Sequence, residues 1–343
     1  MHMIYREDVS QAKPYKERYA AGFEHLIQSR QQQFSQRRAD YSKDIFKNAD
    51  RYREELRNML GWPLADPPAD AKLSVKTVLL AREAGYAVYR MSFEILEGLE
   101  LTGLYFQLDG QEKRPLVLVQ HGGLGSPELI SGLYGSTNNY NRMLERVIAH
   151  GVHAFAPQLF LWGEEKGSFA ERVRLDARLK RVGSSVAAIE LYGLMRILDY
   201  FQAQDTVLGF GMVGLSYGGF YSLFLSALDT RIRSVISCSY FNTRDRYGWP
   251  DWTWWRSAER FDDVEVACLV YPRKLCLEIG TKDEAFDIAY AEKSVDALRR
   301  ISQEVGTQWF TAVSFDGAHE FCRDDSPIQA MVDELCQNHT TQK

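Results

Sequence analysis

The strongest structural signal in this sequence is GMVGLSYGGF, residues 211–220, where an apolar run meets a serine followed by paired glycines. Residues 214–218 match G-x-S-x-G, the pattern of a serine on a sharp turn between a strand and a helix. Such a turn raises the serine Oγ above the edge of the sheet, and the flanking glycines give it room. We therefore predict that Ser216 is a nucleophile. The alternative is an ordinary glycine-rich turn, because short matches also occur by chance.

Apolar strands and helical segments alternate on both sides of this turn. The predicted strands are PLVLVQ (115–120), VHAFAP (152–157), GMVGLS (211–216), RSVISCS (233–239), KLCLEIG (274–280) and WFTAVSF (309–315). The predicted helices cover about 138–150, 184–203 and 326–337, and another begins near Gly218. This alternation predicts an α/β fold with a mostly parallel central sheet and helices on both faces. Ligands of such sheets bind at the carboxyl ends of the strands.

The N-terminal part of the chain follows other patterns. Residues 12–60 carry apolar side chains at helical spacing and predict two helices, which end at the glycine and prolines of 61–68. From about residue 72, three runs rich in β-branched and aromatic residues predict an antiparallel start to the sheet, at 73–81, 86–95 and 101–108. We therefore expect a helical N-terminal extension over 1–70 and a catalytic domain over 71–343.

The segment HGGLG, residues 121–125, directly follows the predicted strand at 115–120. In proteins with a nucleophile elbow, the loop after that strand supplies one backbone N–H of the oxyanion hole, and the residue after the nucleophile supplies the other. We predict Gly123 and Tyr217 as these donors, because a glycine lets a backbone amide approach an oxyanion closely. His121 is expected to hold the loop. The alternative interpretation of the segment is a simple turn.

A serine hydroxyl needs an adjacent base, and that base needs an orienting acid. His319, in FDGAHEF, is the histidine that lies in the loop after the last predicted strand, where the chain order serine, acid, histidine puts the base. The acid is expected after KLCLEIG, in TKDEAFD. We predict Asp283 there, three residues after Gly280, and keep Asp287 as the alternative.

Residues 240–262 interrupt the alternation with a cluster of tryptophans among charged residues. The segment leaves the sheet at the carboxyl end of a strand, so it is a possible lid over the site. The residues predicted to line a substrate pocket are Trp162, Trp249, Trp252, Trp254 and Trp255. Residues 160–163 would form its second wall. Ordinary packing of these rings against the core is the equal alternative, because aromatic side chains dominate cores as well.

Composition excludes several classes of protein. The formal net charge is −5 and the basic residues are scattered, so no footprint for nucleic acid is present. Neither a signal peptide nor a membrane span is readable, which leads to the expectation of a cytoplasmic protein. The five cysteines show no metal-ligand spacing, and no metal site is predicted.

With these motifs in this order, the chain from about 72 to 337 resembles the α/β-hydrolase superfamily, and within it the dienelactone hydrolase and acetyl xylan esterase-like branch. The resemblance rests on HGG after a buried strand, GLSYGG, the GxxD acid loop and GAHEF. The leader that ends in NMLGWPL is also similar to that of acetyl xylan esterase-like bacterial hydrolases. Dienelactone hydrolases use a cysteine nucleophile where this chain has Ser216.

The expected function is hydrolysis of carboxylic esters through an acyl-enzyme, without a cofactor, on acylated carbohydrates or other small esters. Two alternatives stay open. A peptidase or amidase shares the same motifs, and a noncatalytic binding protein could keep the pocket without turnover. The sequence leaves the oligomeric state open.

Overall fold

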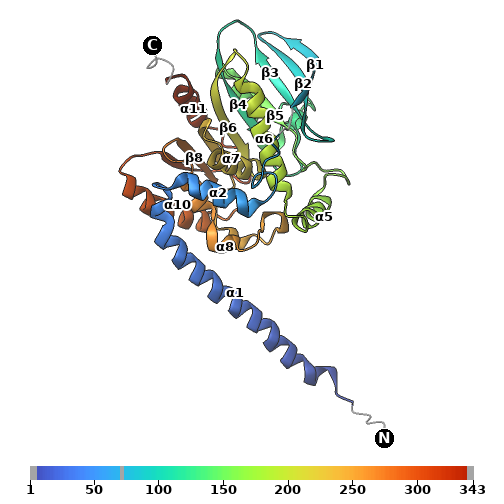
Figure 1. Cartoon of the computed structure of the whole chain (residues 1–343), viewed down its shortest axis with the longest axis vertical. Coiled ribbons are helices and arrows are strands. Elements are labelled where there is room, and N and C mark those ends of the chain that lie inside the picture. The colour runs from blue at the N-terminus through green and yellow to red at the C-terminus, as the bar shows by residue number, and fades with distance from the viewer. Residues whose placement is uncertain (1–5, 70–72, 338–343) are drawn as a thin grey trace.

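The computed structural model describes residues 6–69 and 73–337, and in this part of the chain the strands form one nine-stranded sheet (Figure 1). The strands are β1 Ser74–Glu83, β2 Tyr86–Leu96, β3 Leu99–Leu108, β4 Arg114–Gln120, β5 His153–Pro157, β6 Val207–Leu215, β7 Ile232–Cys238, β8 Lys274–Gly280 and β9 Phe310–Phe315. Their order across the sheet is β1-β2-β3-β5-β4-β6-β7-β8-β9.

The sheet begins antiparallel and continues parallel. The pairs β1–β2, β2–β3 and β3–β5 are antiparallel, and every pair from β5 to β9 is parallel. Both parts of the sequence prediction are confirmed. In the register of β4 with β6, Gln120 lies opposite Gly214. The loop that begins at His121 and the turn at Ser216 therefore leave the same edge of the sheet side by side.

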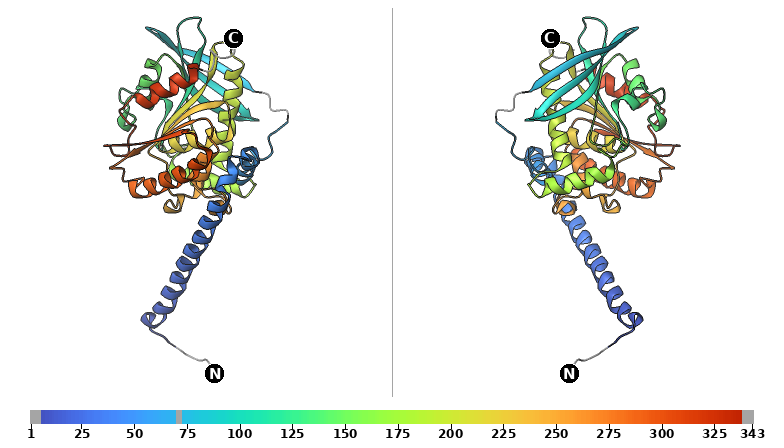
Figure 2. Two further views of the ribbon diagram at one scale, coloured as in Figure 1. Left: turned by 90° about the vertical axis from the view of Figure 1, so that its left-hand side faces the viewer. Right: turned by 90° about the vertical axis from the view of Figure 1, so that its right-hand side faces the viewer.

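Helices cover both faces of the sheet (Figure 2). They are α1 Val9–Ile45, α2 Ala49–Leu60, α3 Pro127–Ile130, α4 Met143–Ala149, α5 Phe169–Lys180, α6 Val186–Gln202, α7 Tyr217–Leu228, α8 Ser257–Arg260, α9 Asp263–Cys268, α10 Ile288–Ser302 and α11 Ser326–Gln337. Short 3₁₀ turns are η1 Asn138–Tyr140, η2 Arg244–Arg246, η3 Pro250–Trp252 and η4 Gln303–Val305.

Two apolar cores lie on opposite faces of the sheet because successive side chains of a strand point to opposite sides. On β4, Leu116 and Leu118 belong to one core, and Val117 and Val119 to the other. Side chains of α2, α6, α7, α9 and α10 complete the first core, and those of α4 and α11 complete the second. The central strands are therefore buried on both faces, as their continuous apolar runs predict.

The two predicted N-terminal helices are present, but they pack differently. Helix α2 buries Tyr52, Leu56 and Leu60 in the first core. Helix α1 meets the body near its C-terminal end, where Arg38 and Tyr41 donate hydrogen bonds to backbone carbonyls of α8, and its N-terminal part projects outward (Figures 1 and 2). Among the described residues, no helix combines the length and apolar character that crossing a bilayer requires.

The aromatic segment 240–262 contains η2, η3 and α8 and is held from two sides. Arg38 of α1 lies 3.4 Å from the carboxylate of Glu265, directly after the segment, and 3.6 Å from that of Asp262. On the other side, Lys180 of α5 donates a hydrogen bond to the carbonyl of Pro250. The segment is thus fixed to the body by α1 and α5.

Candidate active site

Ser216 occupies a strained turn between β6 and α7. Its dihedral angles are φ 62° and ψ −122°, in the left-handed region that a non-glycine residue adopts only where its surroundings enforce it. A Cβ added at Gly214 would lie 2.3 Å from the carbonyl oxygen of Gly218, and one at Gly218 would lie 2.2 Å from that of Gln120. The turn therefore needs both glycines of the motif, and it carries Ser216 at the carboxyl edge of the sheet.

His319 and Asp283 form a hydrogen-bonded pair. The Nδ1 of His319 lies 2.9 Å from Oδ2 of Asp283, whose side chain is 1% exposed. The other carboxylate oxygen of Asp283 accepts the backbone N–H groups of Ala285 and Phe286, at 2.8 and 2.9 Å. This carboxylate is fixed by three bonds. It can hold the imidazole with Nδ1 protonated, which leaves the Nε2 lone pair free to accept a proton.

Asp287 has a different partner from the one that the alternative prediction requires. Its carboxylate accepts the N–H of Ala289 at 2.8 Å and caps the N-terminus of α10. The structure therefore brings Asp283, and not Asp287, together with His319.

Hydrogen bonds hold the histidine loop against the acid loop and against β7, which in turn binds the nucleophile turn. The N–H of Lys282 donates to the carbonyl of Gly317 at 2.9 Å. The Sγ of Cys238 lies 3.4 Å from the carbonyl of Glu320, and the carbonyl of Cys238 accepts the N–H of Ser216 at 2.9 Å. Ser216 Oγ and the His319 ring are not hydrogen-bonded to each other within the described residues; such bonds often tighten only when substrate binds.

The predicted oxyanion residues lie at neighbouring positions of the sheet edge. Within 6–69 and 73–337, the N–H groups around Gly123 are occupied: Gly122 donates to the Tyr140 hydroxyl at 2.8 Å and Leu124 to the carbonyl of Leu161. The N–H of Gly123 has no partner there, and that of Tyr217 is the first in α7 and so has none within its own helix. Both amides are available to an oxyanion.

His121 ties the oxyanion loop to the segment that follows β5. Its Nε2 accepts the N–H of Leu159 at 3.1 Å, and its Nδ1 lies 2.8 Å from the carbonyl of Gly122, which fits a neutral ring protonated on Nδ1. Burial lowers the pKa of His121 to about 4. The ring holds the loop, as the sequence predicts.

We expect His121 to make the folded protein less stable as the pH falls. Between pH 6.5 and 4 the unfolded chain binds a proton at this residue and the folded chain does not, so the stabilisation present above pH 6.5 is lost through this window. We measure the free energy of unfolding in urea at pH 7 and at pH 5. Its decrease between the two pH values should be about 2 kcal/mol smaller in His121→Gln than in wild type. His25→Gln, on the exposed surface of α1, is the control, and an identical loss in all three proteins would contradict the prediction.

A row of aromatic rings connects the histidine with the oxyanion residues. Phe286 stacks on His319 with ring centroids 5.6 Å apart, and Trp249 lies 5.9 Å from Phe286 and stacks on Tyr217 at 5.7 Å. Phe169, at the start of α5, lies 5.6 Å from Tyr217 on the other side. A Cβ at Gly123 would collide with the Phe169 ring, so glycine there also makes room for this wall.

The other predicted pocket residues have different surroundings. Trp252 and Trp254 are buried, at 3% and 5% exposure, and stack on Phe220 of the first core. They act as packing residues, the second of the two roles considered for them. Trp255 is 87% exposed and projects into solvent. Trp162 lines a separate apolar cavity of about 410 Å³ between β3, α5 and α6. Trp249 therefore joins the ring row at the site, and the buried Trp252 supports that row from below, with its ring centroid 4.5 Å from that of Tyr217 and 4.6 Å from that of Trp249.

A buried ionic network beneath Tyr217 is the feature of the site that the sequence did not reveal. Arg172 of α5 is fully buried and binds Asp251 through Nε at 2.7 Å and Glu190 through Nη1 at 2.9 Å. The Tyr217 hydroxyl donates to the carboxylate of Asp251 at 3.1 Å. Burial alone would lower the pKa of Arg172, but the negative charges of Glu190 and Asp251 outweigh it and hold that pKa above its ordinary value.

Arg172→Met is expected to destabilise the protein by about 3–5 kcal/mol, because it leaves the buried carboxylates of Glu190 and Asp251 without their counter-charge. The matched control is Arg174→Met in the same helix, where the side chain is 70% exposed and pairs with Glu171, and the expected cost is below about 1 kcal/mol. Urea unfolding of both variants measures the difference. Equal midpoints would mean that the network contributes nothing beyond a surface pair.

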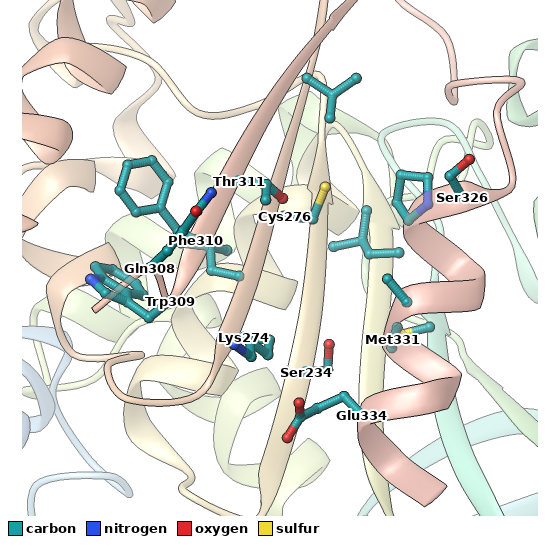
Figure 3. A pocket seen from close by; sticks show the side chains of 15 residues that line it. Ser234, Lys274, Cys276, Gln308, Trp309, Phe310, Thr311, Ser326, Met331 and Glu334 are labelled. Atoms are coloured by element: carbon teal, nitrogen blue, oxygen red, sulfur yellow. The ribbon is translucent and has the colours of Figure 1, made fainter. Parts of the chain in front are cut away.

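A cavity of about 510 Å³ lies well away from these residues (Figure 3). It lies between α11 and the strands β7, β8 and β9, and Ser234 and Lys274 place it toward the amino ends of the parallel strands. Ser216 follows the carboxyl end of β6. The cavity is therefore not part of the candidate site.

Comparison with known proteins places the fold. No family model matches the chain. Over 250 residues, 67% of this chain and 81% of the relative, it is 26% identical to a Bacillus subtilis (strain 168) protein named “Putative hydrolase YtaP”.

Solved structures that resemble this chain include a “putative acetyl xylan esterase” from Bacteroides fragilis, with a TM-score of 0.65 at 18% identity over 81% of this chain and 77% of that one. A glucuronoyl esterase from Solibacter usitatus gives a TM-score of 0.62 at 13% identity over 83% and 92% of the two chains. An acetyl xylan esterase from Paenibacillus sp. R4 gives 0.55 at 14% identity over 86% and 93%. The chain has the α/β-hydrolase fold.

Proposed function

We propose that this protein is a serine hydrolase that cleaves carboxylic esters, with Ser216 as nucleophile, His319 as general base and Asp283 as the acid that orients it. The observation that carries the proposal is the Asp283–His319 hydrogen bond, formed at the same edge of the sheet as the strained turn of Ser216. The three residues follow the carboxyl ends of β6, β8 and β9, in the chain order that is typical of this fold and that supports the proposal.

In the first step, Ser216 Oγ attacks the ester carbonyl carbon while Nε2 of His319 takes the hydroxyl proton. The carbonyl π bond opens, and the resulting oxyanion is held by the amides of Gly123 and Tyr217. The buried carboxylate of Asp283 stabilises the imidazolium that forms. When the C–O bond to the alcohol breaks, His319 returns its proton to the leaving oxygen, and the acyl group stays on Ser216.

In the second step, water attacks the acyl carbon and gives one proton to His319. The same two amides hold the second oxyanion. When the bond between the acyl carbon and Ser216 Oγ breaks, His319 returns its proton to Oγ, which releases the carboxylic acid and restores the Ser216 hydroxyl. No metal or organic cofactor takes part in this scheme. The partner that the site requires is a small ester.

Acylated carbohydrates are the substrate class that we favour. The names of the structural neighbours, acetyl xylan esterase and glucuronoyl esterase, support this choice by analogy. The rings of Trp249 and Phe169 pack on Tyr217, and aromatic rings beside a site are surfaces on which a sugar or an apolar acyl group can stack. A cytoplasmic location stays a prediction from the sequence.

A substrate panel tests the reaction class. We expect p-nitrophenyl acetate and butyrate, and acetylated xylo-oligosaccharides, to be hydrolysed by the wild-type protein, and matched p-nitroanilides to be left intact. Turnover of the anilides without turnover of the esters would identify an amidase instead. A well-folded protein that turns over neither, yet binds the esters, would be a binding protein and would end the proposal.

A further inference from the structure

The first 22 residues of α1, Val9 to Arg30, form an arm that projects from the body of the protein (Figures 1 and 2). Large apolar side chains of this arm are exposed to water: Val9, Tyr15, Tyr19, Phe23, Leu26 and Ile27, with exposures from 47% to 80%. Most of the stability of a protein helix comes from packing of its apolar face, and a lone helix is marginal in water. The arm therefore has the kind of surface that is typical of a helix packed against another protein surface.

Three of the exposed residues, Val9, Phe23 and Ile27, lie on the side of α1 that already packs on the body, and the other three lie about a quarter turn or more further round the helix. Eighteen residues make five turns of an α-helix. Phe23 thus points the same way as Tyr41, which donates to the backbone of α8, and Ile27 the same way as Ile45, which is fully buried. Among the described residues, the Phe23 ring packs on the ring of Tyr19, which belongs to the same helix. Part of the exposed apolar surface of the arm therefore continues the side of α1 that is already packed.

Charge favours this protein's own body as the surface that the arm meets. The arm holds four basic residues and two acidic ones, which gives it a net charge of +2, whereas the whole chain carries −5. The rest of the chain therefore carries −7. Two arms would repel each other if they paired alone, but an arm and the body of another copy attract.

The area that an arm can cover favours a reciprocal exchange. Twenty-two residues span about 33 Å, and one side of a helix about 10 Å wide covers about 330 Å². One docked arm thus buries about 660 Å² counted over both partners, which is too little for a stable specific interface. Two exchanged arms bury about 1,300 Å², which is within the range of specific complexes. A two-fold dimer provides both contacts at once.

We propose that this chain forms a homodimer in which each copy lays residues 9–30 of α1 on the body of the other. The arm of a single copy has no surface within its own reach, because the helix leads straight away from the body that it is attached to. This proposal is independent of the ester chemistry and holds for an active or an inactive enzyme.

The solution mass tests the proposal. By size-exclusion chromatography with light scattering at about 10 μM, we expect wild type at twice the 39.4 kDa mass of the chain. The double variant Tyr19→Asn/Phe23→Asn, which keeps the charge of the arm, should run at 39.4 kDa, because its dimer dissociation constant rises at least about 100-fold.

The control for the double variant is Gln28→Asn/Gln32→Asn. Both positions are exposed and lie on the side of α1 opposite Tyr19 and Phe23, so this variant should stay dimeric. Circular dichroism melting confirms that each variant is folded. A monomeric wild type at about 100 μM would overturn the proposal. A Tyr19→Asn/Phe23→Asn variant that is as dimeric as the control would also overturn it.

Cross-linking distinguishes an exchanged arm from two paired arms. Light and heavy isotope-labelled chains are mixed, allowed to exchange and treated with a lysine-reactive reagent. We expect Lys13 and Lys16 of light chains to be linked to body lysines of heavy chains. Links between copies that join only arm to arm would overturn the exchange.

Discussion

Replacing Ser216 with alanine is expected to lower kcat for p-nitrophenyl acetate by roughly 10⁴- to 10⁶-fold, while the fold persists. The variant removes the oxygen that forms the acyl-enzyme but keeps the two amides that hold the oxyanion, so a small residual rate above the background remains. Steady-state hydrolysis by the purified variant measures the loss. Mass spectrometry after a rapid quench should find the acetylated protein with wild type only.

The control is Ser314→Ala, which removes a hydroxyl from an exposed position of the edge strand β9 and should leave kcat unchanged. If Ser216→Ala were as active as Ser314→Ala, the nucleophile would not be Ser216 and the triad would be wrong. Circular dichroism melting of both variants separates a chemical loss from an unfolded protein.

Replacing Asp283 with asparagine is expected to lower kcat by about 10⁴-fold with little change in KM. The amide of asparagine can donate to the ring nitrogen that Asp283 accepts from, and it then favours the tautomer whose Nε2 carries the proton. The variant also loses the negative charge that stabilises the imidazolium of His319. Steady-state kinetics of the purified variant measures kcat and KM separately.

Asp287→Asn is the matched control. Asp287 caps α10, so its replacement should cost at most about 1 kcal/mol of stability and leave kcat within a few-fold of wild type. The opposite outcome, a large loss with Asp287→Asn and a small one with Asp283→Asn, would reverse the assignment of the acid.

Local patterns were enough to predict the elements that position the site. The strand that ends at Leu215, the helix that follows Ser216 and the order of strands and loops up to His319 all have their signals within a few neighbouring residues. Asp283 could be preferred from its distance to Gly280 alone. Each of these predictions depends on backbone geometry that a short segment dictates by itself.

Helix α5 was not predicted, because the buried side of this helix carries charged residues in place of the apolar residues from which a helix is recognised. Arg172 and Asp176, one turn apart, are both fully buried. A side chain of this type is usually exposed, and it becomes an interior residue only through partners that lie far away in the sequence, such as Glu190 and Asp251. No local rule finds such a network.

The tryptophans of residues 240–262 illustrate the same limit. Trp254 and Trp255 are neighbours in the sequence, yet one stacks on Phe220 in the core and the other is almost fully exposed. The segment has no regular period from which an inward side could be derived. Phe169 and Phe286, which flank the site, carry no motif, and their part in it follows only from their contacts with Tyr217 and His319.

The bond between Asp251 and the Tyr217 hydroxyl has a consequence for attempts to redesign the specificity of this protein. In the proposed mechanism the Tyr217 amide holds the oxyanion, and its phenol binds Asp251 of the aromatic segment, so a change in that segment would also move the amide. Replacing the whole segment with that of another enzyme would remove Asp251 and could shift the Tyr217 amide as well. A low activity of such a chimera would then not report on substrate choice. A library confined to Trp249 and Phe169, with Asp251 retained, varies the rings beside the site while keeping the hydrogen bond that anchors Tyr217.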